Sequence, residues 1–188
     1  MSYLIMTTGK THSGKTTFGK KLAKKIKNNI LIDTDQIAEF LKDNYPNLYS
    51  KDFLKNSTKL APGYFLKKEV ANTIFKNSFK TDYIIISTSA NSTKKLRSSL
   101  ITLAKKNNRK VIMAYFNLPE KILLNRIDKN NRSKKCLYYS KDFKDLLLNK
   151  QSTRFESANK EESDYFFEIN KVTDVDNVYN EILNIIKK

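Results

Sequence analysis

A short apolar run at residues 3–8 leads into the segment Gly-Lys-Thr-His-Ser-Gly-Lys-Thr at residues 9–16. Directly after it, Phe18, Leu22 and Ile26 recur at every fourth position, as on one face of a helix. The segment matches the pattern G-x-x-x-x-G-K-[ST] at each fixed position, and it lies between a predicted strand and a predicted helix. In this context backbone N–H groups turn inward at a helix N-terminus and bind phosphate oxygens. We therefore expect an α/β domain with a phosphate-binding loop after its first strand.

The loop supplies several candidate ligands for a nucleoside triphosphate. We expect Lys15 to span the β- and γ-phosphates and to act in catalysis, the Thr16 hydroxyl to ligate Mg²⁺, and Thr17 to contact the α-phosphate. His12 is the one imidazole of the chain, and inside this loop we expect a nucleotide contact or a spectator rather than a proton-transfer group. The predicted nucleotide-binding residues of the loop are Gly9, His12, Ser13, Gly14, Lys15, Thr16 and Thr17.

Strand and helix patterns alternate through the rest of the chain. Four further apolar runs indicate strands, at residues 30–32, 83–86, 111–116 and 165–169. Residues 44–63 are predicted to be irregular, with a short helix as the alternative for part of them. Five strands interleaved with helices predict right-handed crossovers and a mainly parallel sheet covered on both faces, with ligands at the carboxyl ends of the strands. The helical stripes are Ile37, Phe40 and Leu41; Leu66, Val70 and Ile74; Leu96, Leu100 and Leu103; Ile122, Leu123 and Ile127; Phe143, Leu146 and Leu147; and Val178, Ile182 and Ile185.

Two carboxylates, Asp33 and Asp35, follow the second predicted strand, one βα unit after the phosphate loop. At the carboxyl edge of a parallel sheet both can face the γ-phosphate. A carboxylate there accepts the proton of an acceptor hydroxyl or holds the waters on Mg²⁺. We expect Asp35 to be the general base and Asp33 to support the metal. The alternative for either residue is a helix N-cap, because the next helical stripe begins at Ile37.

Size and composition limit the remaining classes. With 188 residues, 39% of them hydrophobic, the chain has the size of one domain, which we place at residues 1–188. It has no run of about 18 apolar residues, and the apolar run at residues 3–6 lacks a basic prelude, so we expect no membrane partner and a cytoplasmic location. A lone Cys136 and a lone His12 argue against an internal disulfide, a zinc site and Cys/His catalysis.

The net charge of +17 has two interpretations. Clustered Lys and Arg bind phosphates, so a nucleic-acid partner is one of them. The other, which we favour, is an ordinary solvated surface in a chain of biased composition. Five of the 36 basic residues are Arg and the others are Lys, although Arg is the better fork for phosphate.

Four segments of the chain resemble the small P-loop kinases that include polynucleotide 5′-hydroxyl kinases and zeta-toxin-like kinases. They are residues 9–17, 32–35, 84–91 and 116–126. The resemblance implies a nucleoside-kinase-like P-loop NTPase fold of three layers, with a five-stranded parallel sheet in the order 2-3-1-4-5. It also implies ATP and Mg²⁺ as cofactors and Asp35 as the general base.

The same resemblance implies a small helical lid, at about residues 126–142, that carries Arg126 and Arg132. A polar break at residues 128–131 between two helical patterns supports it independently. An arginine that closes over the triphosphate stabilises charge on the transferred group and excludes water. We therefore expect Arg126 and Arg132 to act in catalysis, and Arg126 also to bind the nucleotide.

Two positions depart from the family pattern. Ser87, Thr88 and Ser89 stand where these kinases commonly carry Asp at the end of the third strand, and Ala38 stands where polynucleotide kinases place an acceptor-binding Arg. We expect a kinase acting on a hydroxyl of a small-molecule acceptor. The alternatives are a polynucleotide 5′-hydroxyl kinase and a non-catalytic protein gated by its bound nucleotide. The oligomeric state is open.

Overall fold

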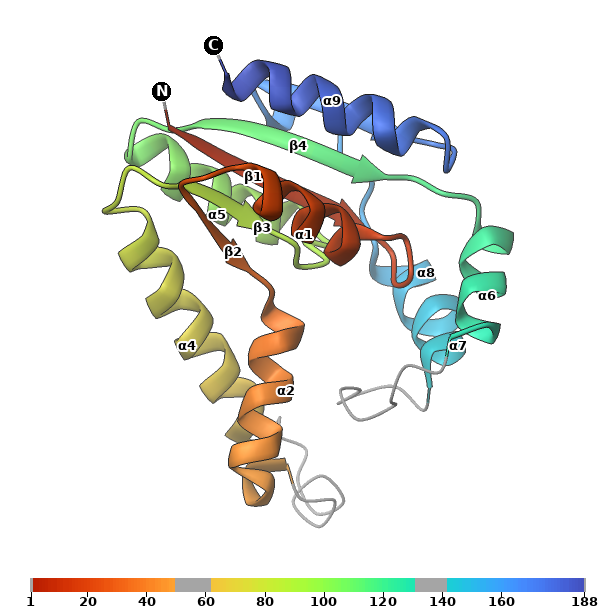
Figure 1. Ribbon diagram of the computed structural model, residues 1–188. Coiled ribbons are helices and arrows are strands. Elements are labelled where there is room, and N and C mark those ends of the chain that lie inside the picture. The colour runs from red at the N-terminus through yellow and green to blue at the C-terminus, as the bar shows by residue number, and fades with distance from the viewer. Residues whose placement is uncertain (1, 50–61, 131–141, 188) are drawn as a thin grey trace.

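A five-stranded parallel sheet forms the centre of the protein (Figure 1). The computed structural model describes residues 2–49, 62–130 and 142–187. The strands are all parallel and lie in the order β2-β3-β1-β4-β5, which confirms the predicted order. They are β1 (Tyr3–Gly9), β2 (Asn29–Ile32), β3 (Ile84–Ser87), β4 (Lys110–Phe116) and β5 (Tyr165–Ile169).

Helices cover both faces of this sheet and extend beyond its carboxyl edge. In Figure 1, α1 and α9 lie on one face, α5 lies on the other, and α2 and α4 run side by side away from the sheet. The helices are α1 (Lys15–Lys25), α2 (Thr34–Asn44), η1 (Pro46–Tyr49), α4 (Pro62–Ser78), α5 (Lys94–Lys106), α6 (Glu120–Asp128), α7 (Phe143–Asp145), η3 (Leu146–Gln151), α8 (Ser152–Arg154), η4 (Lys160–Glu162) and α9 (Asp174–Ile186).

Side chains of the central strands alternate between two hydrophobic cores. In β1, Tyr3 and Ile5 pack in the core that α1 and α9 cover, whereas Leu4 and Met6 pack in the core beneath α4 and α5. Because both faces are buried, the strand is a continuous apolar run rather than an alternating one. This burial confirms the predicted fold of three layers.

The buried face of α5 departs from the predicted leucine stripe at Leu96, whereas Leu100 and Leu103 pack against the core as predicted. Leu96 is 56% exposed, while Arg97 is fully buried and its Nε donates to Glu162 Oε2 at 2.6 Å. The guanidinium also donates to three backbone oxygens, including that of Asn91 at 3.2 Å. The predicted stripe was wrong at Leu96 because a paired arginine takes the core position.

Residues 44–63, predicted to be irregular or in part a short helix, are partly helical. A 3-10 turn, η1, follows α2, and α4 begins at Pro62, which suits the first turn of a helix. Residues 50–61 lie outside the described part of the chain. Helices α2 and α4 contact one another, and we call this pair the arm.

The predicted lid lies beyond β4. Arg126 belongs to α6, and Arg132 lies outside the described residues, as does most of the lid prediction at 126–142. Helix α7, the π-helical turn η3 and α8 follow one another without a break and pack near α6. Within residues 2–49, 62–130 and 142–187, every helix is too short or too polar to span a lipid bilayer.

Candidate functional site

Two glycines shape the phosphate loop between β1 and α1. Gly9 has a φ of 147°, and a Cβ added there would lie 2.7 Å from the carbonyl oxygen of Phe116 on β4. Gly14, with a φ of 106°, is the left-handed N-cap of α1. Residues that carry a side chain rarely adopt these positive φ angles, so the path of the backbone requires glycine at both fixed positions of the motif.

Lys15 and Ser13 are buried inside this loop. The Lys15 ammonium donates to the carbonyl oxygen of Lys10 at 2.6 Å and to Ser13 Oγ at 3.1 Å. Lys15 is only 9% exposed, and it is the first residue of α1, where the helix dipole adds partial positive charge. The loop therefore brings an ammonium and helix-terminal amides together, as an anion-binding site requires.

Asp33 connects the end of β2 with the start of α1. Its Oδ1 accepts hydrogen bonds from the backbone N–H groups of Asp35 at 2.9 Å and Gln36 at 3.4 Å, which makes Asp33 the N-cap of α2. Its Oδ2 accepts from the Thr16 hydroxyl at 3.0 Å. Each oxygen has its own partner, so capping the helix leaves Asp33 beside the predicted metal-binding hydroxyl.

Asp35 lies in the first turn of α2, and its side chain is 60% exposed. Because Asp33 caps the helix, the Asp35 carboxylate is not used for capping. Its Oδ1 lies 3.9 Å from Nζ of Lys67 on α4, and both side chains line the same cleft. Lys67 has no signal in the sequence, since only the packing of the arm brings it to Asp35.

A cleft of about 720 Å³ lies at the carboxyl edge of the sheet. Gly9 and Asp33 are buried and do not line it, and Arg132 is outside the described residues. The predicted site residues that line it are His12, Ser13, Gly14, Lys15, Thr16, Thr17, Asp35 and Arg126. The structure thus brings the phosphate loop, one carboxylate and one arginine of the prediction to a single cavity.

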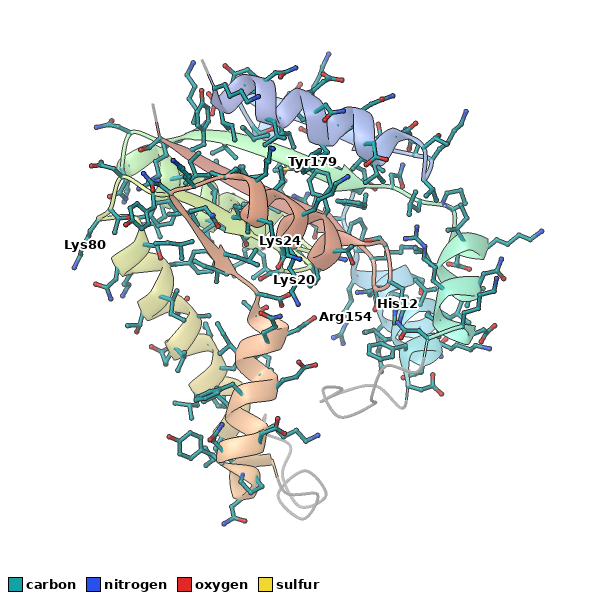
Figure 2. All side chains as sticks on the ribbon, viewed as in Figure 1. His12, Lys20, Lys24, Lys80, Arg154 and Tyr179 are labelled. Atoms are coloured by element: carbon teal, nitrogen blue, oxygen red, sulfur yellow. The ribbon has the colours of Figure 1, made fainter. Side chains whose placement is uncertain are left out.

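Helices beyond β4 hold the phosphate loop from the other side. Arg126 Nη1 donates to the carbonyl oxygens of His12 at 3.1 Å and Ser13 at 2.9 Å, and it lines the cleft as well. Gln151 Oε1 accepts from a backbone N–H of the loop at 2.8 Å. Phe143 packs edge to face on the His12 imidazole, with ring centroids 4.7 Å apart, and Figure 2 shows His12 next to these helices. Sequence reasoning missed Gln151, which no pattern marks, and it predicted Phe143 only as part of a helical stripe, without a role at the site.

The start of α9 closes another side of the cleft. Val172 and Val175 line it, together with Lys21 of α1 and Asp176. The Lys21 ammonium donates to Asp176 Oδ1 at 2.6 Å, and this hydrogen bond raises the pKa of Lys21 above its ordinary value. The ammonium also lies 4.4 Å from the ring centroid of Tyr179, which faces α1 in Figure 2.

Polar side chains in the loop after β3 form hydrogen bonds within the protein. Ser89 Oγ donates to Thr34 Oγ1 at 3.0 Å, and Asn91 Nδ2 donates to the carbonyl oxygen of Thr7 at 2.8 Å. The loop after β3 also accepts a hydrogen bond from the backbone N–H of Gly9, at Ala90 O. This loop therefore supports the phosphate loop from behind.

The oxygen donors of Thr16 and Asp33 fit Mg²⁺, which prefers oxygen ligands and keeps several waters. Among the described residues, no group of three His, Cys, Asp or Glu side chains is arranged to hold a metal ion. A magnesium ion at this site would therefore depend on Thr16 and Asp33, with substrate phosphates and water as its other ligands.

Solved structures, two of the three below described as kinases, share this fold. The crystal structure of Chaetomium thermophilum Kti12 in complex with ADP-AlF3 is 16% identical, covering 96% of this chain and 97% of that chain, with a TM-score of 0.62. A putative kinase from Chloroflexus aurantiacus is 15% identical over 99% of this chain and 96% of that chain, with a TM-score of 0.68. The APS kinase CysC of Mycobacterium tuberculosis, in complex with AMPPNP and APS, is 11% identical over 100% and 98%, with a TM-score of 0.58.

At these identities the likeness establishes the fold, and the predicted P-loop kinase-like architecture is confirmed. No curated protein matches the chain by sequence. The family model described as Chromatin associated protein KTI12 matches residues 1–188. The match spans the phosphate loop, both carboxylates at the start of α2 and the helices beyond β4. The chain therefore belongs to the KTI12 family.

Proposed function

We propose that this protein is an ATP-dependent kinase that transfers the γ-phosphoryl group to a hydroxyl of a small-molecule acceptor. The observation that carries the proposal is a single cleft lined by Lys15 and Thr16 of the phosphate loop and by the exposed carboxylate of Asp35. Two structurally similar proteins support the proposal that the ligand is a nucleotide, since Kti12 was crystallised with ADP-AlF3 and the APS kinase with AMPPNP.

At the nucleotide end, Lys15 and the loop amides bind the β- and γ-phosphates, and Thr17 binds the α-phosphate. Arg126 already lies over the loop and offsets negative charge on the triphosphate. The apolar side chains of Val172 and Val175 offer the base a surface at the edge of the cleft. His12 lines the cleft as a nucleotide contact.

Thr16 and Asp33 are the residues that would hold Mg²⁺. When bound, the ion neutralises charge on the β- and γ-phosphates. Asp33 keeps the Thr16 side chain in place through the 3.0 Å hydrogen bond between them. We further propose that residues 1–188 act as one kinase domain.

Asp35 is the proposed general base. The acceptor oxygen forms a bond to the γ-phosphorus, its proton passes to the Asp35 carboxylate, and the bond between the γ-phosphorus and the bridging oxygen of ADP breaks. Lys67 lies beside the carboxylate and offsets part of its charge. Transfer needs positioning and charge compensation above all, and the cleft provides both.

The test is a mass-spectrometric screen of metabolites and 5′-hydroxyl oligonucleotides with ATP and Mg²⁺, followed by Asp35→Asn. Loss of a general base lowers the rate roughly 10²- to 10⁴-fold, and we expect that fall with an unchanged ATP affinity. Lys15→Ala is the matched control, since it removes ATP binding itself. Transfer by Asp35→Asn at the wild-type rate would refute the base assignment.

The second candidate is a protein gated by its nucleotide without transfer. It is favoured by the end of β3, where Ser87 and Thr88 replace the carboxylate common in the kinases that this chain resembles. In that case no acceptor in the screen stimulates ADP release, while ATP and ADP still bind.

A polynucleotide 5′-kinase has less support. Ala38 is 1% exposed on the core side of α2, so the position at which such kinases carry an acceptor-binding arginine faces away from solvent. Basic side chains are also spread over the molecule, as Lys24, Lys80 and Arg154 show in Figure 2. A nucleic-acid acceptor predicts binding that weakens steeply with salt, whereas a neutral small acceptor does not.

A further inference from the structure

Two neighbouring hydroxyls at the end of β3 are buried and have no hydrogen-bond partner in the described part of the chain. They are Ser87 Oγ and Thr88 Oγ1, in residues that are 0% and 3% exposed. A buried hydroxyl without a partner loses its hydrogen bonds to water and costs free energy. Most such groups in folded proteins are paired with protein or with ordered water. Each of these two hydroxyls therefore requires an explanation.

The two side chains point to opposite faces of the sheet. A Cβ added to Gly19 of α1 would overlap the Thr88 methyl, so Thr88 packs under α1. Ser87 follows Ile86, which belongs to the core on that same face, and therefore points to the opposite one. Thr88 lines the cleft and Ser87 does not. Of the two hydroxyls, only the one on Thr88 belongs to a residue that reaches the functional site.

Thr88 lies beside the candidate magnesium ligands. Its backbone N–H donates to the carbonyl oxygen of Ile32 at 3.1 Å, directly before Asp33. Its methyl meets α1 at Gly19, one turn after Thr16. Thr16 and Asp33 are hydrogen-bonded at 3.0 Å, so three oxygen-bearing side chains from the ends of β2, β3 and the phosphate loop gather at one place.

We propose that the Thr88 hydroxyl binds a water molecule of the Mg²⁺ coordination shell, in the place where related kinases commonly use an aspartate. Magnesium in proteins keeps several waters, and each of them needs an acceptor. The Thr88 oxygen has a free lone pair to accept such a hydrogen bond, and accepting it satisfies the buried hydroxyl. A hydroxyl supplies this acceptor without a negative charge, which leaves Asp33 as the carboxylate nearest Thr16. The inference rests on the nucleotide-binding part of the proposed function and is independent of phosphoryl transfer.

The test measures Mn²⁺ binding to the complex of the full chain with ADP by electron paramagnetic resonance, and ADP binding in EDTA by calorimetry. Thr88→Val keeps the methyl groups against Gly19 and removes the hydroxyl. Groups that orient the ligands of a metal contribute about 10- to 100-fold to its affinity. We expect Thr88→Val to weaken Mn²⁺ binding about tenfold, at the lower end of that range, and to leave ADP binding in EDTA unchanged. Thr88→Ser keeps the hydroxyl and should retain the wild-type Mn²⁺ affinity.

Ser87→Ala is the matched control, because it removes the other buried hydroxyl on the face without the cleft, and it should leave Mn²⁺ affinity unchanged. An unchanged Mn²⁺ affinity in Thr88→Val would overturn the proposal. An equal loss of ADP affinity with metal and in EDTA would also overturn it, since the hydroxyl would then contact the nucleotide. Failure of the wild type to bind ADP at all would instead contradict the proposed function. Should Thr88→Val not fold, Thr88→Ala is measured in its place, with the same two outcomes deciding.

Discussion

The two ends of the cleft differ in how firmly the rest of the protein holds them. The phosphate loop accepts hydrogen bonds from Arg126 of α6 and donates hydrogen bonds to Gln151 of η3 and to Ala90 in the loop after β3, and its Lys15 is buried. At the arm, Asp35 is mostly exposed, and its one ion pair among the described residues is with Lys67, at 3.9 Å. Phe40 and Phe65, two large apolar side chains of the arm, are exposed as well.

This difference between the phosphate loop and the arm bears on nucleotide affinity at one end of the cleft and on acceptor specificity at the other. A loop fixed by contacts from several elements is preorganised, so a polyphosphate that binds there spends little free energy on ordering the site. The Asp35 carboxylate has fewer contacts among the described residues, so under the proposed function a bound acceptor would add contacts to it. We therefore expect nucleotide binding to depend on the fold and acceptor binding to depend on the local surface of α2 and α4.

The largest expected effect concerns the support behind the phosphate loop. Glu162→Ala leaves the fully buried guanidinium of Arg97 without its carboxylate, and breaking a buried ion pair in this way costs about 3–5 kcal/mol of stability. Denaturant unfolding followed by circular dichroism measures the loss. Glu161→Ala, an exposed neighbour, is the control and should lie within about 0.5 kcal/mol of the wild type. If Glu162→Ala lowered the free energy of unfolding by less than about 1 kcal/mol, the ion pair between Arg97 and Glu162 would not be what stabilises the phosphate-loop end of the cleft.

A smaller effect is expected within the loop itself. Gly9→Ala places a Cβ against the carbonyl oxygen of Phe116 and forces a side chain into a conformation that favours glycine. Strain of this kind costs about 1–3 kcal/mol, and it shifts the loop amides that bind phosphate. We expect lower stability in denaturant and weaker ADP binding by calorimetry. Wild-type stability and wild-type ADP affinity in Gly9→Ala would show that the conformation of the loop does not depend on glycine at this position.

The smallest effect is expected at the arm. Lys67→Met removes the partner of Asp35 but keeps most of the buried stem, and partly exposed ion pairs contribute about 0–1 kcal/mol. The free energy of unfolding should therefore change by less than about 1 kcal/mol, close to the value for the exposed neighbour Lys68→Met. If Lys67→Met lowered the free energy of unfolding by about 3 kcal/mol, the arm would be held as firmly as the phosphate loop, and the two ends of the cleft would not differ.

Much of the fold could be predicted from the sequence because its signals are local. The strands at residues 3–8 and 111–116 are continuous apolar runs, which a sheet buried on both faces requires. Residues 9–16 contain the glycines that the backbone path needs and lie between a strand and a helix. The sheet order was an expectation from a resemblance, and the pairings confirm it.

Local patterns failed where a distant partner decides the outcome. The leucine stripe of α5 was wrong at Leu96, because Arg97, paired with Glu162, takes the buried position at that turn of the helix. Lys67 and Gln151 reach the cleft through packing between helices, which leaves no periodic signal in the chain.

The sequence by itself determined a phosphate loop, two carboxylates one βα unit later and an alternation of strands and helices. Tertiary structure alone decided that Asp33 uses one oxygen to cap α2 and the other to accept from Thr16, while Asp35 is left to the cleft. It also decided that Thr88, rather than Ser87, lines that cleft. A sequence motif reflects the backbone conformation of residues that are neighbours in the chain. The partner of a side chain depends instead on how helices and strands that are distant in the sequence pack against one another.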